Sequence, residues 1–306
     1  MSRLLAGLLV AAALSPTAPT AAGEASGPDE PAAAEVFVPV PPVEGIPGPL
    51  FFETPTLTFV PKGTMRVTLG ARWLDDVELP YSGLAGDLAQ LGIVRVDVGF
   101  GSRIEVRVQG AVQQRLRVDR DRSDVRPPTD VSSGTTTDTG DFSVLTIAQV
   151  LPERGWKAAF GLRVEVKLPN TNETRGIGTN TTDVLLSVPA QKHFGRLVLN
   201  GDLGIGILTV PTNAQRQTDV LLYGFAVAWE ARRGWLLSGE LNGRWSSAGG
   251  RPGTGNRASI RGGVSWATGP WAVGVILSRG RGEAEERIGA ALAVSYGFRG
   301  VRSVTP

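Results

Sequence analysis

Residues 156–168 read WKAAFGLRVEVKL, and this stretch decides the fold class. Apolar side chains dominate every second position from Trp156 to Leu168, whereas Arg163, Glu165 and Lys167 fall between them. Successive side chains of a β-strand point to opposite faces, so a strand here has one apolar face and one charged face. A helix would distribute the same charges around its axis. The stretch therefore predicts a strand that lies between an apolar phase and water.

The same period of two recurs after residue 62, for example in RIEVRVQGAVQ at 103–113. No apolar run there reaches the roughly 20 residues that a membrane-spanning helix needs. We expect about twelve strands, an even number, as in bacterial outer-membrane barrels. Their expected ranges are 64–74, 91–100, 103–116, 141–151, 156–168, 182–190, 196–208, 219–230, 235–245, 257–268, 271–279 and 287–298.

Short and long connections alternate between these strands. The short ones are 101–102, 152–155, 191–195, 231–234 and 269–270. The long ones are 75–90, 117–140, 169–181, 209–218 and 246–256, with 280–286 somewhat shorter. Because outer-membrane barrels place their short turns in the periplasm, we expect one transmembrane antiparallel up-and-down β-barrel with both chain ends on that side.

Aromatic residues fall near the expected strand ends, on the apolar face. Trp235 and Trp245 bracket one strand, and ten residues at about 3.3 Å rise and about 40° tilt climb roughly 25 Å, the height of the apolar band of such barrels. This placement predicts two interfacial girdles. Their members are Trp73, Trp156, Tyr223, Trp229, Trp235, Trp245, Trp266, Trp271, Tyr296 and Phe298.

The chain before the barrel divides in two. Residues 1–23 carry one early charge, an apolar run and then small residues, as a secretory signal peptide does; a buried N-terminal helix is the alternative. Residues 24–62 are rich in Pro and Ala, which favours a linker or a periplasmic or plug segment over a central strand. We expect one barrel domain over 63–298 and a tail over 299–306.

Composition excludes several classes of function. The chain has no cysteine, so disulfides, thiolate metal sites and cysteine nucleophiles are absent. The 31 Lys and Arg and the 29 Asp and Glu are dispersed, which implies no nucleic-acid partner. A soluble β-sandwich or soluble barrel would also alternate, but it would not combine export, asymmetric loops and aromatic girdles.

No constellation for catalysis stands out. The single histidine, His193, falls in an expected periplasmic turn, and no Gly-x-Ser-x-Gly setting accompanies it. Zinc-protease, P-loop, dinucleotide and calcium-loop motifs are also missing. We expect no enzyme activity, no cofactor and no metal site.

Charged side chains on the opposite face should line the lumen. The principal candidates are Arg66, Arg72, Arg95, Arg107, Glu105, Arg163, Glu165, Asp202, Glu240, Arg244 and Arg261. The same register also places Arg103, Lys157, Lys167, Arg196, Arg257, Arg287, Asp97 and Asp183 on this face. An excess of fixed positive charge would favour anions. Alternatively, the charges pair across strands and fill a small barrel, with the long loop 117–140 as a plug.

Residues 156–208 resemble a known family. The resemblance rests on KLPN at 167–170, GIGT at 176–179, TDVLL at 182–186, FG at 194–195 and LNGDLG at 199–204. This pattern is similar to outer-membrane proteins that are associated with the meta-pathway of phenol degradation and described as transporters. The resemblance implies an outer-membrane barrel that passes aromatic or hydrophobic solutes.

The end of the last expected strand resembles the signal that barrels present to their assembly machinery, with Tyr296 and Phe298 spaced by two, although eight residues follow. The expected partners are therefore the Sec export pathway, the barrel-assembly machinery, the lipid bilayer, lipopolysaccharide and a small solute. The expected function is passive passage of small solutes, either anionic or aromatic and hydrophobic, across the outer membrane. The alternative is a non-conducting structural or adhesive barrel whose loops bind a partner.

Overall fold

The computed structural model describes residues 37–39, 50–79, 81–121, 131, 133–211, 213–247, 252–282 and 285–300. The expected signal peptide, much of the expected linker and the tail beyond residue 300 lie outside the described residues. No helix in the described ranges is long and apolar enough to cross a membrane.

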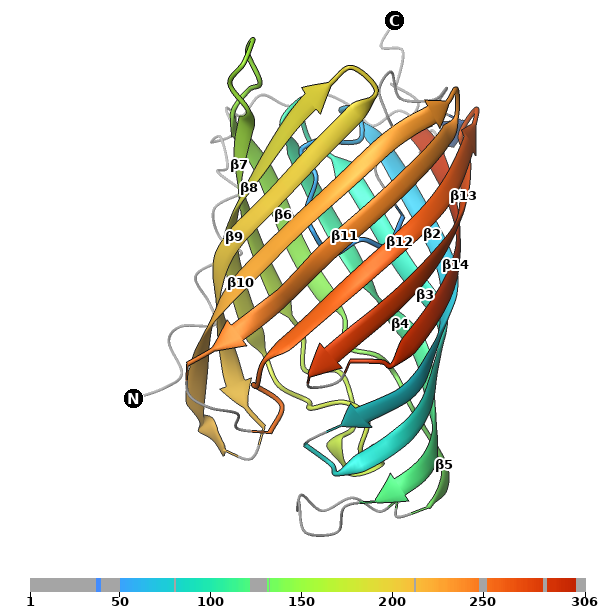
Figure 1. Ribbon diagram of the computed structural model, residues 1–306, viewed down its shortest axis with the longest axis vertical. Coiled ribbons are helices and arrows are strands. Elements are labelled where there is room, and N and C mark those ends of the chain that lie inside the picture. Colours follow the sequence, from blue (N-terminus) through green and yellow to red (C-terminus); the bar gives the residue numbers. More distant parts are fainter. Residues whose placement is uncertain are drawn as a thin grey trace, which may run out of the picture. The chain divides into compact units, whose positions relative to one another are not determined.

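Twelve antiparallel strands close into one barrel, which confirms the predicted fold class. They are β2 (Thr64–Leu79), β3 (Leu84–Gly99), β4 (Ile104–Asp121), β6 (Ser143–Leu151), β7 (Ala159–Lys167), β8 (Asp183–Phe194), β9 (Leu197–Val210), β10 (Asn213–Arg232), β11 (Trp235–Ser246), β12 (Arg257–Thr268), β13 (Trp271–Gly282) and β14 (Ile288–Gly300). The barrel closes where β14 pairs with β2 (Figure 1).

Within the described ranges, three short elements accompany the barrel. β1 (Phe37–Pro39) pairs with β14 beyond the last residue that β13 pairs, and β5 (Gly134–Asp138) pairs with β4. A single 3-10 turn, η2 (Glu173–Arg175), lies in the connection between β7 and β8. The described part of the loop 117–140 thus extends the sheet through β5.

Two expected loops are largely strand, which corrects the predicted boundaries. β2 and β3 continue through most of 75–90 and meet at a tight turn, and β10 begins at Asn213 within the expected loop 209–218. The extra length of β2 and β3 is stabilised by an apolar cluster at this end of the barrel. Its buried members are Leu74, Val77, Leu79, Leu84, Leu88, Leu116 and Ile177.

The two faces of the barrel wall differ as the alternation predicts. Along β11, Leu237, Leu241 and Trp245 are exposed on the outside, while Glu240 and Asn242 are buried on the inside. A wall with large apolar side chains outside and charges inside matches hydrocarbon around the barrel and a polar interior.

Candidate transport site inside the barrel

Buried ion pairs occupy the inner face of the wall. The Arg107 guanidinium donates to Asp97 at 2.5 Å and to Glu105 at 2.9 Å, and all three side chains are buried. Arg163 donates in the same way to Glu165 and, at 3.3 Å, to Asp202. Arg261 lies 2.9 Å from Glu240 on the neighbouring strand. Ion pairs at this depth satisfy charges that would be costly to bury alone.

The interior holds a cavity of about 450 Å³, and most of the predicted lumen residues lie beside it. Those that line it are Arg72, Arg95, Arg107, Arg163, Glu165 and Arg244. Arg66 and Glu105 line a smaller adjoining pocket with Arg95. Asp202, Glu240 and Arg261 lie behind these surfaces, paired as above.

Four basic residues that the sequence placed on the inner face are exposed instead. Arg103, Lys157 and Arg196 lie beside the short turns, and Arg287 lies just before β14. The prediction was wrong for these four because the alternation continues past the ends of the strands, where a side chain reaches solvent on either face.

A segment that comes before the first barrel strand lies inside the barrel. We call residues 50–61 the luminal segment; it reads LFFETPTLTFVP. Leu50, Phe51, Phe52, Leu57 and Val60 are buried against the wall. Figure 1 shows the segment in blue within the ring of strands.

Three backbone amides of the luminal segment donate to side chains of the wall. Thr54 N donates to Glu240 at 2.5 Å. Leu57 N donates to Gln191 at 2.7 Å, and Val60 N donates to Glu105 at 3.0 Å. The acceptors come from β11, β8 and β4, each three strands from the next in the ring. The segment therefore contacts wall strands that span half of the circumference.

Glycines in the wall make room for the luminal segment. A Cβ atom added to Gly70 would lie 2.4 Å from the Phe51 ring, and one added to Gly161 would lie 2.7 Å from Leu57. A Cβ atom at Gly224 would lie 2.7 Å from the Thr54 hydroxyl. Contacts below 3.0 Å cannot form without displacement, so glycine at these three positions is what allows the close approach.

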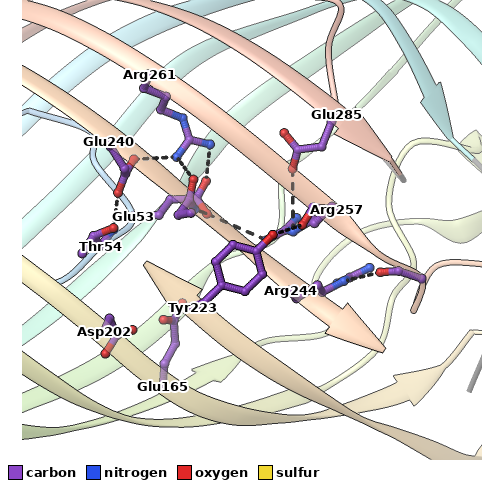
Figure 2. A network of polar contacts seen from close by, with 12 residues as sticks. Glu53, Thr54, Glu165, Asp202, Tyr223, Glu240, Arg244, Arg257, Arg261 and Glu285 are labelled. Carbon is purple, nitrogen blue, oxygen red and sulfur yellow. Dashed lines mark hydrogen bonds and ion pairs between the residues drawn. The ribbon is translucent and has the colours of Figure 1, made fainter. Parts of the chain in front are cut away.

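The carboxylate of Glu53 is held by the wall from two strands. One oxygen lies 2.8 Å from Arg261, and the other accepts from Asn242 at 2.9 Å and lies 3.8 Å from Arg257. Figure 2 shows Glu53 between Arg261 and Arg257, with Glu285 on the far side of Arg257 at 3.7 Å. Burial raises the pKa of Glu285 to about 7, although Arg257 opposes the rise.

Sequence reasoning missed Glu53, Asn242, Gln191 and Glu285 as parts of this site. One signal was available: Glu53 is the only charged residue between 50 and 61. A single charge in an apolar, proline-containing stretch requires a partner if the stretch is buried. The partners themselves follow no local pattern, because they lie far away in the chain.

The aromatic residues predicted for the girdles lie on the outer face or at its rim. Trp73, Trp156, Trp229, Trp235, Trp245, Trp266 and Trp271 are exposed, while Tyr223, Tyr296 and Phe298 are half-buried. Ring contacts link some of them: Trp235 lies 6.4 Å from Trp266, and Tyr296 lies 4.5 Å from both Trp271 and Phe298.

His193 lies near the end of β8 and not in the expected turn, and its ring contacts Glu153 at 2.7 Å. Glu153 also accepts from Lys192 at 2.6 Å. Slight burial tends to raise the pKa of Glu153, but hydrogen bonds from Lys192 and His193 lower it to about 2. Across the described ranges, no group of three or more His, Cys, Asp or Glu could hold a metal ion.

Comparison with known proteins gives the fold alone. No protein-family model and no curated protein matches the chain in sequence. An outer membrane channel from Pseudomonas putida F1 has a TM-score of 0.60 and 15% identity, over 79% of this chain and 98% of that chain. The KdgM porin has a TM-score of 0.44 and 7% identity, over 76% and 98%.

The translocator domain of autotransporter NalP from Neisseria meningitidis has a TM-score of 0.47 and 11% identity, over 78% of this chain and 90% of that chain. The first likeness places the chain among closed barrels of the outer-membrane type. The resemblance to the phenol-degradation transporters is not confirmed by these comparisons and stays a prediction.

Proposed function

We propose that this chain is an outer-membrane channel for small solutes and that the luminal segment acts as its plug. The observation that carries the proposal is the set of amide contacts from Thr54, Leu57 and Val60 to three separated strands. A segment held by hydrogen bonds, an ion pair and packing, but not as a strand of the wall, can leave while the barrel stays closed. The neighbouring cavity then becomes part of a continuous path.

We also propose a location in the cell, which we infer from the exposed apolar side chains of the wall. The apolar outer face needs hydrocarbon around it, so we propose export by the N-terminal signal peptide, assembly by the barrel machinery and residence in the outer membrane beside lipopolysaccharide. Fractionation of envelope membranes tests this placement. Recovery of the chain in the soluble periplasmic fraction would contradict it.

The solute class is the finer part of the proposal. Seven basic and four acidic side chains line the cavity, so the surface that a solute meets is more basic than acidic. Several acids that neutralise these bases, such as Asp97 and Asp202, do not line it. Phe51, Phe52 and Ile93 contribute apolar surface. Both features suit anionic solutes and solutes with an aromatic or apolar body.

A disulfide between the plug and the wall tests the proposal. The Cβ of Thr54 lies 3.4 Å from a Cβ built on Gly224, close to the roughly 3.5–4.5 Å of disulfides. Because the chain has no cysteine, Thr54→Cys with Gly224→Cys introduces the only pair. In planar bilayers we expect the oxidised variant to be silent and the reduced variant to conduct.

The two single-cysteine variants are the matched controls, and neither should respond to the reductant. Equal conductance in the oxidised and reduced states would show that the luminal segment does not block the pore. Silence of every variant and of the native chain, in correctly folded barrels, would favour the second candidate. That candidate is a non-conducting barrel that binds a partner through its loops, and the filled interior is the observation in its favour.

A further inference from the structure

The wall supplies donors to both oxygens of the Glu53 carboxylate. Arg261 and Asn242 each donate to a different oxygen, at 2.8 and 2.9 Å, and Arg257 approaches the second oxygen. All three donors lie on the paired strands β11 and β12. Two guanidinium groups and an amide around one carboxylate are the arrangement by which proteins recognise a carboxylate ligand.

These donors are held in place by groups other than Glu53. Arg261 is buried and also donates to Glu240 at 2.9 Å and to the Asn242 side-chain oxygen at 3.1 Å. Arg257 lies beside Glu285. When Glu53 withdraws, the wall therefore keeps a preorganised set of donors that lacks its carboxylate.

The Glu53 carboxylate is reachable from the cavity, whereas Arg261, the guanidinium nearest to it, is deeply buried. The Glu53 side chain is 40% exposed and lines the cavity, but the Arg261 side chain is only 4% exposed. Phe51, Phe52 and Arg72 line the same space. A molecule in the cavity with one carboxylate and an apolar body could place the first on the donors and the second against the two rings.

We infer that Arg261, Asn242 and Arg257 form a binding site for the carboxylate of a small solute with an apolar or aromatic body. Glu53 occupies this site as an internal substitute, and a solute carboxylate that replaces it releases the luminal segment. The inference rests on the proposed function and gives it a solute class and a trigger.

The free energy of replacing Glu53 by a solute carboxylate determines the solute concentration at which the replacement occurs. One carboxylate replaces another on the same donors, so the contacts at the site change little. The tether gives Glu53 an effective concentration of the order of millimolar, as for short flexible linkers. We therefore expect a solute to compete with Glu53 in the range of about 1–100 mM, unless its apolar body adds affinity.

The first test measures binding without reference to conductance. Benzoate is titrated calorimetrically into the native full chain and into Glu53→Gln, both refolded in detergent, with uncharged benzamide as the matched probe. Glu53→Gln keeps the size of the side chain but removes the competing charge. We expect benzoate to bind Glu53→Gln at least tenfold more tightly than the native chain, and benzamide to show no such gain.

Equal benzoate affinities for the two chains, or an equal gain for benzamide, would overturn the inference. Two further variants show whether the donors are responsible. Arg257→Gln, added to Glu53→Gln, should weaken benzoate binding about tenfold, because Arg257 is the guanidinium that approaches the second carboxylate oxygen. Gly262→Ala, whose new Cβ would meet nothing within 4 Å, should leave the affinity unchanged.

The second test measures plug release. Thr54→Cys, as a single variant, reports through its rate of reaction with a water-soluble maleimide. We expect millimolar benzoate, but not benzamide, to increase this rate several-fold. An unchanged rate despite benzoate binding would overturn the trigger.

The two tests separate the inference from the proposed function. A carboxylate-specific gain in affinity and labelling in a barrel that never conducts would support the site and overturn the channel. Conductance that depends on the plug but not on Glu53 would support the channel and overturn the carboxylate site.

Discussion

Glu53 and Arg261 are 208 residues apart in the chain, yet their side chains form an ion pair of 2.8 Å inside the barrel. The same guanidinium also binds Glu240. Arg261 therefore joins the luminal segment to the wall and, at the same time, neutralises a buried acid of the wall. Loss of Arg261 should therefore destabilise the barrel more than loss of a neighbouring arginine.

We predict that Arg261→Gln destabilises the barrel by about 3–5 kcal/mol, because it leaves Glu240 buried without its counter-charge. Arg257→Gln should cost about 1 kcal/mol or less, since Arg257 is more exposed and its acidic neighbours lie 3.7 and 3.8 Å away. Urea unfolding of the refolded barrel measures both. Similar midpoints for the two variants would contradict this view of Arg261.

Alanine at Gly224 should displace the plug. Gly224→Ala places a Cβ at 2.7 Å from the Thr54 hydroxyl, so we predict a higher fraction of open channels in this variant. Gly201→Ala and Gly262→Ala are matched controls, because their new Cβ atoms would meet nothing. Open probability in planar bilayers is the measurement, and a rise in the controls of the same size would refute the explanation.

A charge on the outer face should be costly in a membrane. Val275 lies near the middle of β13 and is exposed. Val275→Arg should destabilise the barrel by about 2–4 kcal/mol in lipid vesicles, the cost of arginine near the bilayer midplane. Val275→Leu should be nearly neutral. An equally neutral Val275→Arg would show that this face does not meet hydrocarbon.

Affinity at the proposed carboxylate site should depend on pH through Glu285. The charged groups that act on it are Arg257, Glu53, Glu286 and Arg261. Because its pKa is raised to about 7, Glu285 becomes neutral as the pH falls, and the site then gains positive charge. Removing Glu53 removes one cause of the rise, so the transition in Glu53→Gln should lie between 4.5 and 7.

We therefore predict that Glu53→Gln binds benzoate more tightly at pH 5.5 than at pH 8, while a carboxyl with a pKa of about 4 stays largely ionised. Adding Glu285→Gln should abolish the difference. Calorimetric titrations at the two pH values measure it, and a pH dependence that survives Glu285→Gln would assign it to another group.

Acid should weaken the barrel at the turn that contains Glu153. The pKa of Glu153 falls from 4.5 to about 2 on folding, so the carboxylate stabilises the fold above pH 4.5 and this contribution is lost between pH 4.5 and 2. Glu153→Gln should reduce the loss of stability over that window. Unfolding midpoints at pH 6 and pH 3 test the prediction, and identical losses in both chains would contradict it.

The barrel could be predicted from sequence because its cause is local. Each strand has hydrocarbon on one face and a polar interior on the other, so apolar and polar residues alternate in stretches such as 156–168. The luminal segment records no such period. Its amides bind side chains from β4, β8 and β11, and the space it fills is made by glycines on other strands. Both relations exist only after the ring has closed.

The luminal segment binds the wall through main-chain amides, and this sets which substitutions it tolerates. Any residue except proline carries the required N–H, so the side chains at Thr54, Leu57 and Val60 can change during evolution while those contacts persist. The segment contains two prolines, Pro55 and Pro61, and each directly follows a residue whose amide binds the wall. Neither proline stands at a position where such an amide contact is made. Among homologues, the acceptors Glu240, Gln191 and Glu105 should therefore vary less than the residues that bind them.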